Sequence, residues 1–76
     1  MEIKTRYENI DDSELFILIV ESERFERTGI IPDNLFKYTI AIKEELNMGC
    51  ALCQYATYVV GELRREATLR YFKEFL

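Results

Sequence analysis

The chain has 76 residues, of which 49% are hydrophobic, and its formal net charge is −4 at pH 7. This composition is too apolar for a disordered chain and too acidic for a general attraction to nucleic acid or anionic membrane. Because the chain has no histidine and only three glycines, His-based catalysis, His-containing metal sites and glycine-rich phosphate loops are excluded. We therefore expect one domain over residues 1–76 that is not an enzyme and holds no cofactor.

Residues 1–10 are predicted to form an extended or β-like arm. In this segment Ile3, Thr5 and Tyr7 alternate with charged residues, which is the period of a half-buried strand. A single strand has nothing to pair with inside one chain, so the arm either lies across helices or pairs with a second copy.

Residues 12–28 are predicted to form the first helix. Asp11 and Glu14 have the spacing of a capping box, and Gly29 supplies a stop. The apolar run 15–20 leaves a buried strand as the alternative, which would form a hairpin with the arm. If the run is helical, its apolar residues predict burial on several sides.

Two further helices are predicted at residues 32–47 and 50–75. Pro32 suits a first helical turn, and the Asn47–Gly49 segment suits a stop. In residues 50–75, which lack proline, apolar residues recur at three- and four-residue steps. This third helix would be about 39 Å long, against about 22 Å for a helix of fifteen residues.

A third helix of that length predicts an overhang, and the overhang predicts a homodimer. The end beyond the shorter helices would expose apolar side chains unless a second copy covered them. A kink at Gly61 that folds the end back is the alternative, and it would leave a monomer. The candidate interface residues are two tyrosines near the start of the helix and four residues at its end: Tyr55, Tyr58, Tyr71, Phe72, Phe75 and Leu76.

Cys50 and Cys53 form a CxxC motif, the one site-like motif in the chain. Its functional interpretations are a redox pair at a helix N-terminus, or half of a four-cysteine zinc site completed by a second copy. A redox CxxC normally follows a strand of a βαβ unit, which this chain lacks, and cysteine is often buried. The favoured interpretation is therefore two ordinary buried cysteines, with no metal.

The second helix, the turn and the third helix also resemble a helix-turn-helix motif in their order. A recognition helix presents Arg, Lys, Asn or Gln near its N-terminus, but the third helix has no cation before Arg64. Its basic residues, among them Arg65 and Arg70, offset the helix dipole at the far end. DNA binding is therefore an alternative that the sequence disfavours.

Several residues of the second half are similar to those of a known family. Phe36, the Asn47-Met48 pair and the Arg65-Glu66-Ala67-Thr68 run resemble the helical hairpin of the small cyanobacterial phycobilisome-degradation adaptors. The resemblance covers the second half of the chain and needs a gap in the turn. It assigns no role to any residue.

The sequence thus predicts a mainly helical homodimer that binds an unidentified protein as a regulator, adaptor or inhibitor. A dimeric DNA-binding regulator and a CxxC-dependent redox or zinc-linked protein are the alternatives. The N-terminus has no basic-then-apolar signal, and the longest apolar run, residues 15–20, is too short to span a bilayer. We therefore expect a cytoplasmic protein that does not enter a membrane.

Overall fold

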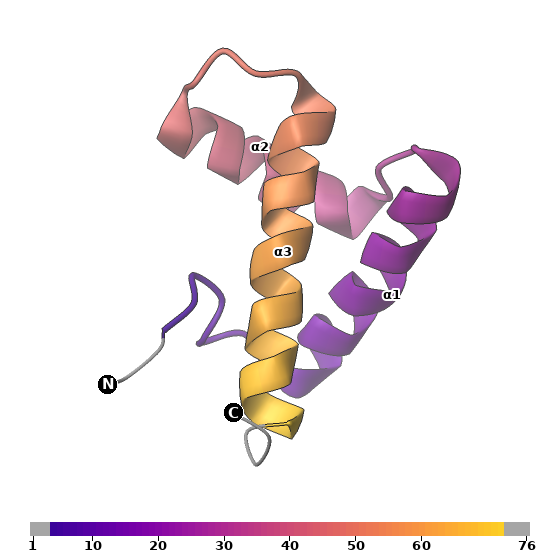
Figure 1. Ribbon diagram of the computed structural model, residues 1–76, viewed down its shortest axis with the longest axis vertical. Helices are drawn as coiled ribbons and strands as arrows, with labels where there is room; N and C mark the ends of the chain where they lie inside the picture. The colour runs from indigo at the N-terminus through magenta and orange to yellow at the C-terminus, as the bar shows by residue number, and fades with distance from the viewer. Residues whose placement is uncertain (1–3, 73–76) are drawn as a thin grey trace.

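The computed structural model describes residues 4–72, and within this range the protein is a compact three-helix domain without strands (Figure 1). The helices are α1 (Asp12–Thr28), α2 (Asp33–Leu46) and α3 (Leu52–Tyr71). The predicted all-α class is confirmed. The apolar run 15–20 lies inside α1, so the alternative of a strand at that place is wrong.

The helix ends follow the capping signals of the sequence. The Asp11 carboxylate accepts a hydrogen bond from the Glu14 N–H at 2.8 Å, and Gly29 ends α1 with a positive φ of 76°. Asn47 ends α2 in the left-handed region, with φ 45°. The third helix starts at Leu52, two residues later than expected, because the chain before it is extended. Residues 73–75, which were predicted to be helical, lie outside the described residues.

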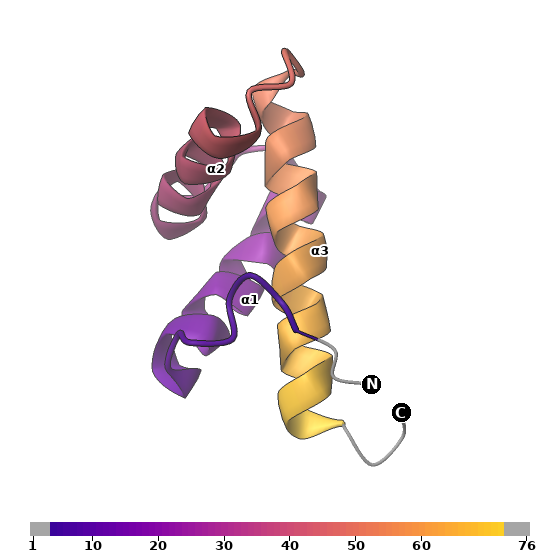
Figure 2. The same cartoon turned by 90° about the vertical axis from the view of Figure 1, so that its left-hand side faces the viewer.

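The two shorter helices lie one after the other along the same side of α3 (Figures 1 and 2). The 20 residues of α3 span about 30 Å, while α1 and α2 span about 26 and 21 Å. The first half of α3 is crossed by α2, and its second half is approached by α1. Together the two shorter helices cover most of the length of α3, so no large part of α3 extends beyond them. The helix also continues without a kink through Gly61 (Figure 2), so the predicted alternative of a folded-back end does not occur in residues 52–71.

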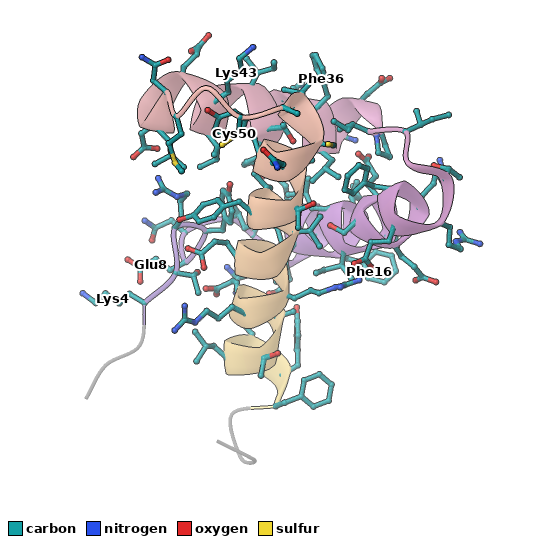
Figure 3. All side chains as sticks on the ribbon, turned by 45° about the horizontal axis from the view of Figure 1, so that its top comes forward. Lys4, Glu8, Phe16, Phe36, Lys43 and Cys50 are labelled. Atoms are coloured by element: carbon teal, nitrogen blue, oxygen red, sulfur yellow. The ribbon has the colours of Figure 1, made fainter. Side chains whose placement is uncertain are left out.

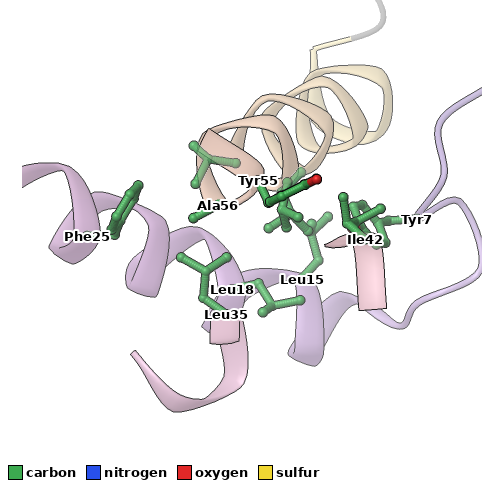
Figure 4. Packing of buried hydrophobic residues seen from close by; sticks show 11 residues of the cluster. Tyr7, Leu15, Leu18, Phe25, Leu35, Ile42, Tyr55 and Ala56 are labelled. Carbon is green, nitrogen blue, oxygen red and sulfur yellow. The ribbon is translucent and has the colours of Figure 1, made fainter. Parts of the chain in front are cut away.

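The core lies where the three helices meet (Figure 4). Apolar side chains from every helix are buried there, and Tyr7 of the N-terminal segment covers one side. The fully or nearly buried side chains include Leu15 and Leu18 of α1, Leu35 and Ile42 of α2, and Tyr55, Val59 and Leu63 of α3. The core is thus complete within one chain.

The N-terminal segment is a loop in its described part, residues 4–10, and not the predicted β-like arm. The chain turns at residues 6–9, so it cannot remain extended. The predicted alternation still holds for burial, because Thr5 and Tyr7 are buried while Lys4 and Arg6 are exposed. Ile3 lies outside the described residues.

Candidate interaction surfaces

Arg70 holds the N-terminal loop against α3. Its Nε donates to Glu66 at 2.5 Å and its Nη1 donates to Asp12 at 2.9 Å. Its Nη2 donates to the backbone carbonyls of Tyr7, Glu8 and Ile10 at 3.3, 3.2 and 2.6 Å. We call Arg70 and these partners the Arg70 cluster. The Glu66 carboxylate beside the guanidinium is the main cause of a raised Arg70 pKa.

Glu66 is the buried acid of this cluster, with an exposed fraction of 5%. The Thr5 hydroxyl donates to its Oε1, so both carboxylate oxygens have partners. The i,i+4 spacing of Glu66 and Arg70 is the signal of this pair in the sequence. It reveals neither the burial of Glu66 nor its contact with Thr5. Because its polar groups are paired, the cluster is structural.

The outer face of α1, which we define by Phe16, Ile17 and Val20, is the principal unexplained surface. These side chains have exposed fractions of 70%, 47% and 43%. Figure 3 shows Phe16 projecting from α1 away from α2. The run 15–20 was expected to be buried on several sides, but Leu15 and Leu18 alone are fully buried in it. The core of one chain therefore leaves this face uncovered.

The outer face of α1 lies close to the end of α3. The Tyr71 hydroxyl donates to Asp12 at 3.0 Å, and Asp12 is one helical turn before Phe16. This hydrogen bond, followed by that from Arg70, holds the Asp12 pKa below its usual value. Tyr71 and Phe72 are each 55% exposed. The structure thus brings two of the predicted interface residues near an apolar face that the sequence did not single out.

The other predicted interface residues differ in position. Tyr55 is a core residue, and its hydroxyl accepts a hydrogen bond from the Met48 N–H at 2.7 Å. Tyr58 is exposed and lies under Arg6, whose guanidinium carbon is 5.9 Å from the ring centroid. The remaining two, Phe75 and Leu76, lie outside the described residues. Tyr55 is therefore not available as an exposed anchor in this conformation.

An open recess of about 350 Å³ lies where α2 ends and α3 begins. Its wall is mostly apolar. The residues that line it are Leu46, Met48, Cys50, Gln54, Tyr55 and Tyr58.

The two cysteines are free, with Cys50 half-buried and Cys53 exposed. The expectation that both are buried was therefore wrong for Cys53. Because α3 begins at Leu52, Cys50 precedes the helix and Cys53 belongs to its first turn. No group of three or more cysteine, aspartate or glutamate side chains among residues 4–72 is arranged to hold a metal ion. A zinc site shared with a second copy stays a prediction.

The N-terminal half of α3, residues 52–61, contains no Lys or Arg that could bind a phosphate, and the first cation of the helix is Arg64. Arg64 binds Glu26 with both terminal nitrogens, through Nη1 to Oε2 at 2.9 Å and through Nη2 to Oε1. This carboxylate is the main cause of a raised Arg64 pKa. The cation nearest the middle of α3 is thus already paired with an acid.

Two tyrosines at the edge of the core have unusual environments. The rings of Tyr7 and Tyr38 meet edge to face, with centroids 5.4 Å apart. Burial raises the pKa of Tyr7 to about 12, and its buried hydroxyl has no hydrogen-bond partner among the described residues. Burial, together with a hydrogen bond from its hydroxyl to Glu14 at 2.5 Å, raises the pKa of Tyr38 to about 12.

Comparisons of the chain with protein-family models, curated proteins and solved structures found no match. The resemblance of the second half to the phycobilisome-degradation adaptors therefore receives no support from them. Between residues 4 and 72, no helix is both long enough and apolar enough to cross a membrane. The surfaces described above are thus the basis for a functional argument.

Proposed function

We propose that the protein is a non-enzymatic cytoplasmic homodimer that acts by binding another protein, as a regulator, adaptor or inhibitor. The observation that carries this proposal is the outer face of α1, where Phe16 is 70% exposed beside Ile17 and Val20. Exposed apolar patches of this kind mark interaction sites. Tyr71, which is hydrogen-bonded to Asp12 of α1, and the next residue, Phe72, add exposed aromatic rings at the end of α3.

The energetics favour a covered face. Full burial of an aromatic or aliphatic side chain is worth about 1.5–3 kcal/mol relative to exposure in water. Phe16, Ile17 and Val20 are 70%, 47% and 43% exposed, so covering all three gains about 2–5 kcal/mol, against a net domain stability of about 5–15 kcal/mol. Lys and Glu also have better helix propensity than Phe, Ile or Val. Phe16, Ile17 and Val20 therefore stabilise α1 less than charged residues would, unless a partner covers them.

The recess at the start of α3 gives the proposed dimer a second surface for another protein. It lies at the opposite end of α3 from Tyr71 and Phe72, so covering the outer face of α1 leaves it open. Met48 at its edge is 65% exposed, and a flexible thioether adapts to varied apolar partners.

Light scattering after size exclusion at micromolar concentration tests the dimer. The expected mass is twice the chain mass of 9.1 kDa. Phe16→Glu is expected to give the mass of one chain, because it buries a charge in the proposed interface. Ala41→Glu, which adds the same charge to an exposed position of α2, is the control and should stay dimeric. A wild-type mass of 9.1 kDa that does not change with concentration would refute the dimer.

Affinity purification from the source cells, followed by mass spectrometry, tests binding to another protein. A specific partner should be retained by the wild type and by Ala41→Glu and lost with Met48→Glu, which places a charge at the edge of the recess. If the same proteins are recovered with all three, the recess is not the partner site.

A further inference from the structure

We infer that a second copy of the chain docks on the outer face of α1 with its own α1 antiparallel, across a two-fold axis that passes between Ile17 and Val20. This inference rests on the proposed homodimer and names its geometry. A two-fold interface must be self-complementary, because the same patch occurs on both sides. The outer face of α1 has such a pattern.

The residues of this face follow a simple order along the helix. Positions three, four and seven residues apart share one side of a helix, and residues 13, 16, 17, 20, 23, 24 and 27 have this spacing. All seven are exposed. The side begins with a small polar residue beside the acidic first turn, continues with the three apolar residues and ends with Glu23, Arg24 and Arg27.

The charges at the two ends favour the antiparallel arrangement. Asp12 lies at the acidic end, and its side chain is 75% exposed although it binds Arg70. The guanidinium groups of Arg24 and Arg27 have no hydrogen bond or ion pair with any residue that the structure describes. The exposed Glu23 offsets one of these two charges, and the neighbouring Glu26 is neutralised by Arg64, so this end keeps a net positive charge.

An antiparallel pair therefore brings the basic end of each copy to the acidic end of the other. A parallel pair would instead place Arg24 against Arg24 and Arg27 against Arg27, and like charges repel. The helix dipoles also oppose each other in the antiparallel pair.

The outward face of α3 is a poorer site for a second copy. Between its ends this face carries Thr57, Gly61 and Arg65, which are exposed and offer little apolar area. The dimer that the sequence predicted through the third helix is therefore assigned to α1. Tyr71 and Phe72 form its flank, near Asp12, where Arg27 of the second copy can lie over an aromatic ring.

Disulfide crosslinking tests the orientation. In a Cys50→Ser, Cys53→Ser background, Ser13→Cys and Arg24→Cys are made as separate proteins. The midpoint between residues 13 and 24 is also the midpoint between residues 17 and 20, where the two-fold axis passes. In the antiparallel dimer, residue 13 of one copy therefore faces residue 24 of the other copy. Two copies of one variant would have their thiols about 16 Å apart along the axis, too far for a disulfide, whose Cα atoms lie within about 7 Å.

The expected result under mild oxidation is a covalent dimer in the mixture of the two variants and none in either variant alone. Self-crosslinking of both variants would show a parallel pair and overturn the inference. A dimer by light scattering that crosslinks in neither case would also overturn it, while the proposed homodimer would stand. A monomer by light scattering would refute both. Circular dichroism of each variant verifies that the helices are intact.

Charge exchange gives a second, independent measurement. Arg24→Glu should raise the dimer dissociation constant by about two- to thirtyfold, since each exposed charge contact is worth about 0.2–1 kcal/mol and occurs twice. Adding Ser13→Lys should restore the affinity, because the new cation faces the new acid. If the double variant is as weak as the single one, residues 13 and 24 do not meet.

Discussion

Replacing Arg70 with alanine is expected to lower the free energy of unfolding by about 3–4 kcal/mol. The guanidinium is the partner of Glu66, whose side chain is 7% exposed, and its own side chain is 18% exposed. Without the guanidinium, the Glu66 carboxylate keeps the Thr5 hydroxyl as a hydrogen-bond donor but loses its ion-pair partner. The loss of unfolding free energy should therefore fall in the range for breaking a buried ion pair by removing one partner.

The magnitude follows from the separate contacts. Breaking a buried ion pair costs about 3–5 kcal/mol, and the Glu66 contact at 2.5 Å belongs to this class. The contact with Asp12 is exposed to solvent, so it adds little to this loss. The loop carbonyls of Glu8 and Ile10 lose a donor, but water replaces it where they are accessible. The lower part of the buried-pair range is therefore the expected value.

Chemical denaturation of Arg70→Ala measures this loss, and it is done at a fixed protein concentration because the stability of the proposed dimer depends on concentration. Arg65→Ala is the matched control on the same helix. Arg65 is 60% exposed and lies 3.9 Å from Glu62, so its loss should change stability by less than about 0.5 kcal/mol. Equal effects of the two substitutions would refute the assignment of Arg70 as the residue that holds the loop.

Three further substitutions test the environments of single residues. Tyr7→Phe should leave stability unchanged or raise it by about 1 kcal/mol, because it removes a buried hydroxyl without a partner among the described residues. It should also reduce an alkaline loss of stability between about pH 10 and 12, where the unfolded chain releases tyrosine protons that the folded Tyr7 and Tyr38 retain. Gly61→Ala should raise stability by about 1 kcal/mol, since nothing lies within 4 Å of the added Cβ, whereas Gly29→Ala should lower it because φ there is +76°. Thermal and urea unfolding measure all three, and a Gly61→Ala protein less stable than the wild type would contradict an open α3 face.

The sequence predicted the features that depend on neighbouring residues. The cap at Asp11, the stop at Gly29 and the stop at Asn47 are local backbone signals, and all three are confirmed. Helical periodicity likewise predicted the three helices. These signals act over one or two turns, so a single sequence contains them.

The candidate surfaces depend on contacts between distant residues, which periodicity does not contain. The apolar residues of α1 look alike in sequence, yet Leu15 is buried and Phe16 is exposed because α2 and α3 cover one side of the helix. The late start of α3 at Leu52 follows from the extended backbone of Ala51, a residue that has good helix propensity. The role of Arg70 likewise requires knowing which loop passes beside α3.

The Arg70 cluster also orders events during synthesis of the chain. Arg70 is added 60 residues after Ile10, whose carbonyl it binds. At about 5–20 residues per second, translation needs roughly 3–12 s to supply it. Until Glu66 is added the N-terminal loop has neither acid nor guanidinium to bind, even after synthesis of α1 and α2 is completed at Leu46. A nascent chain that stops before Arg70 would therefore carry an unattached N-terminal segment, which is a natural substrate for chaperones and proteases.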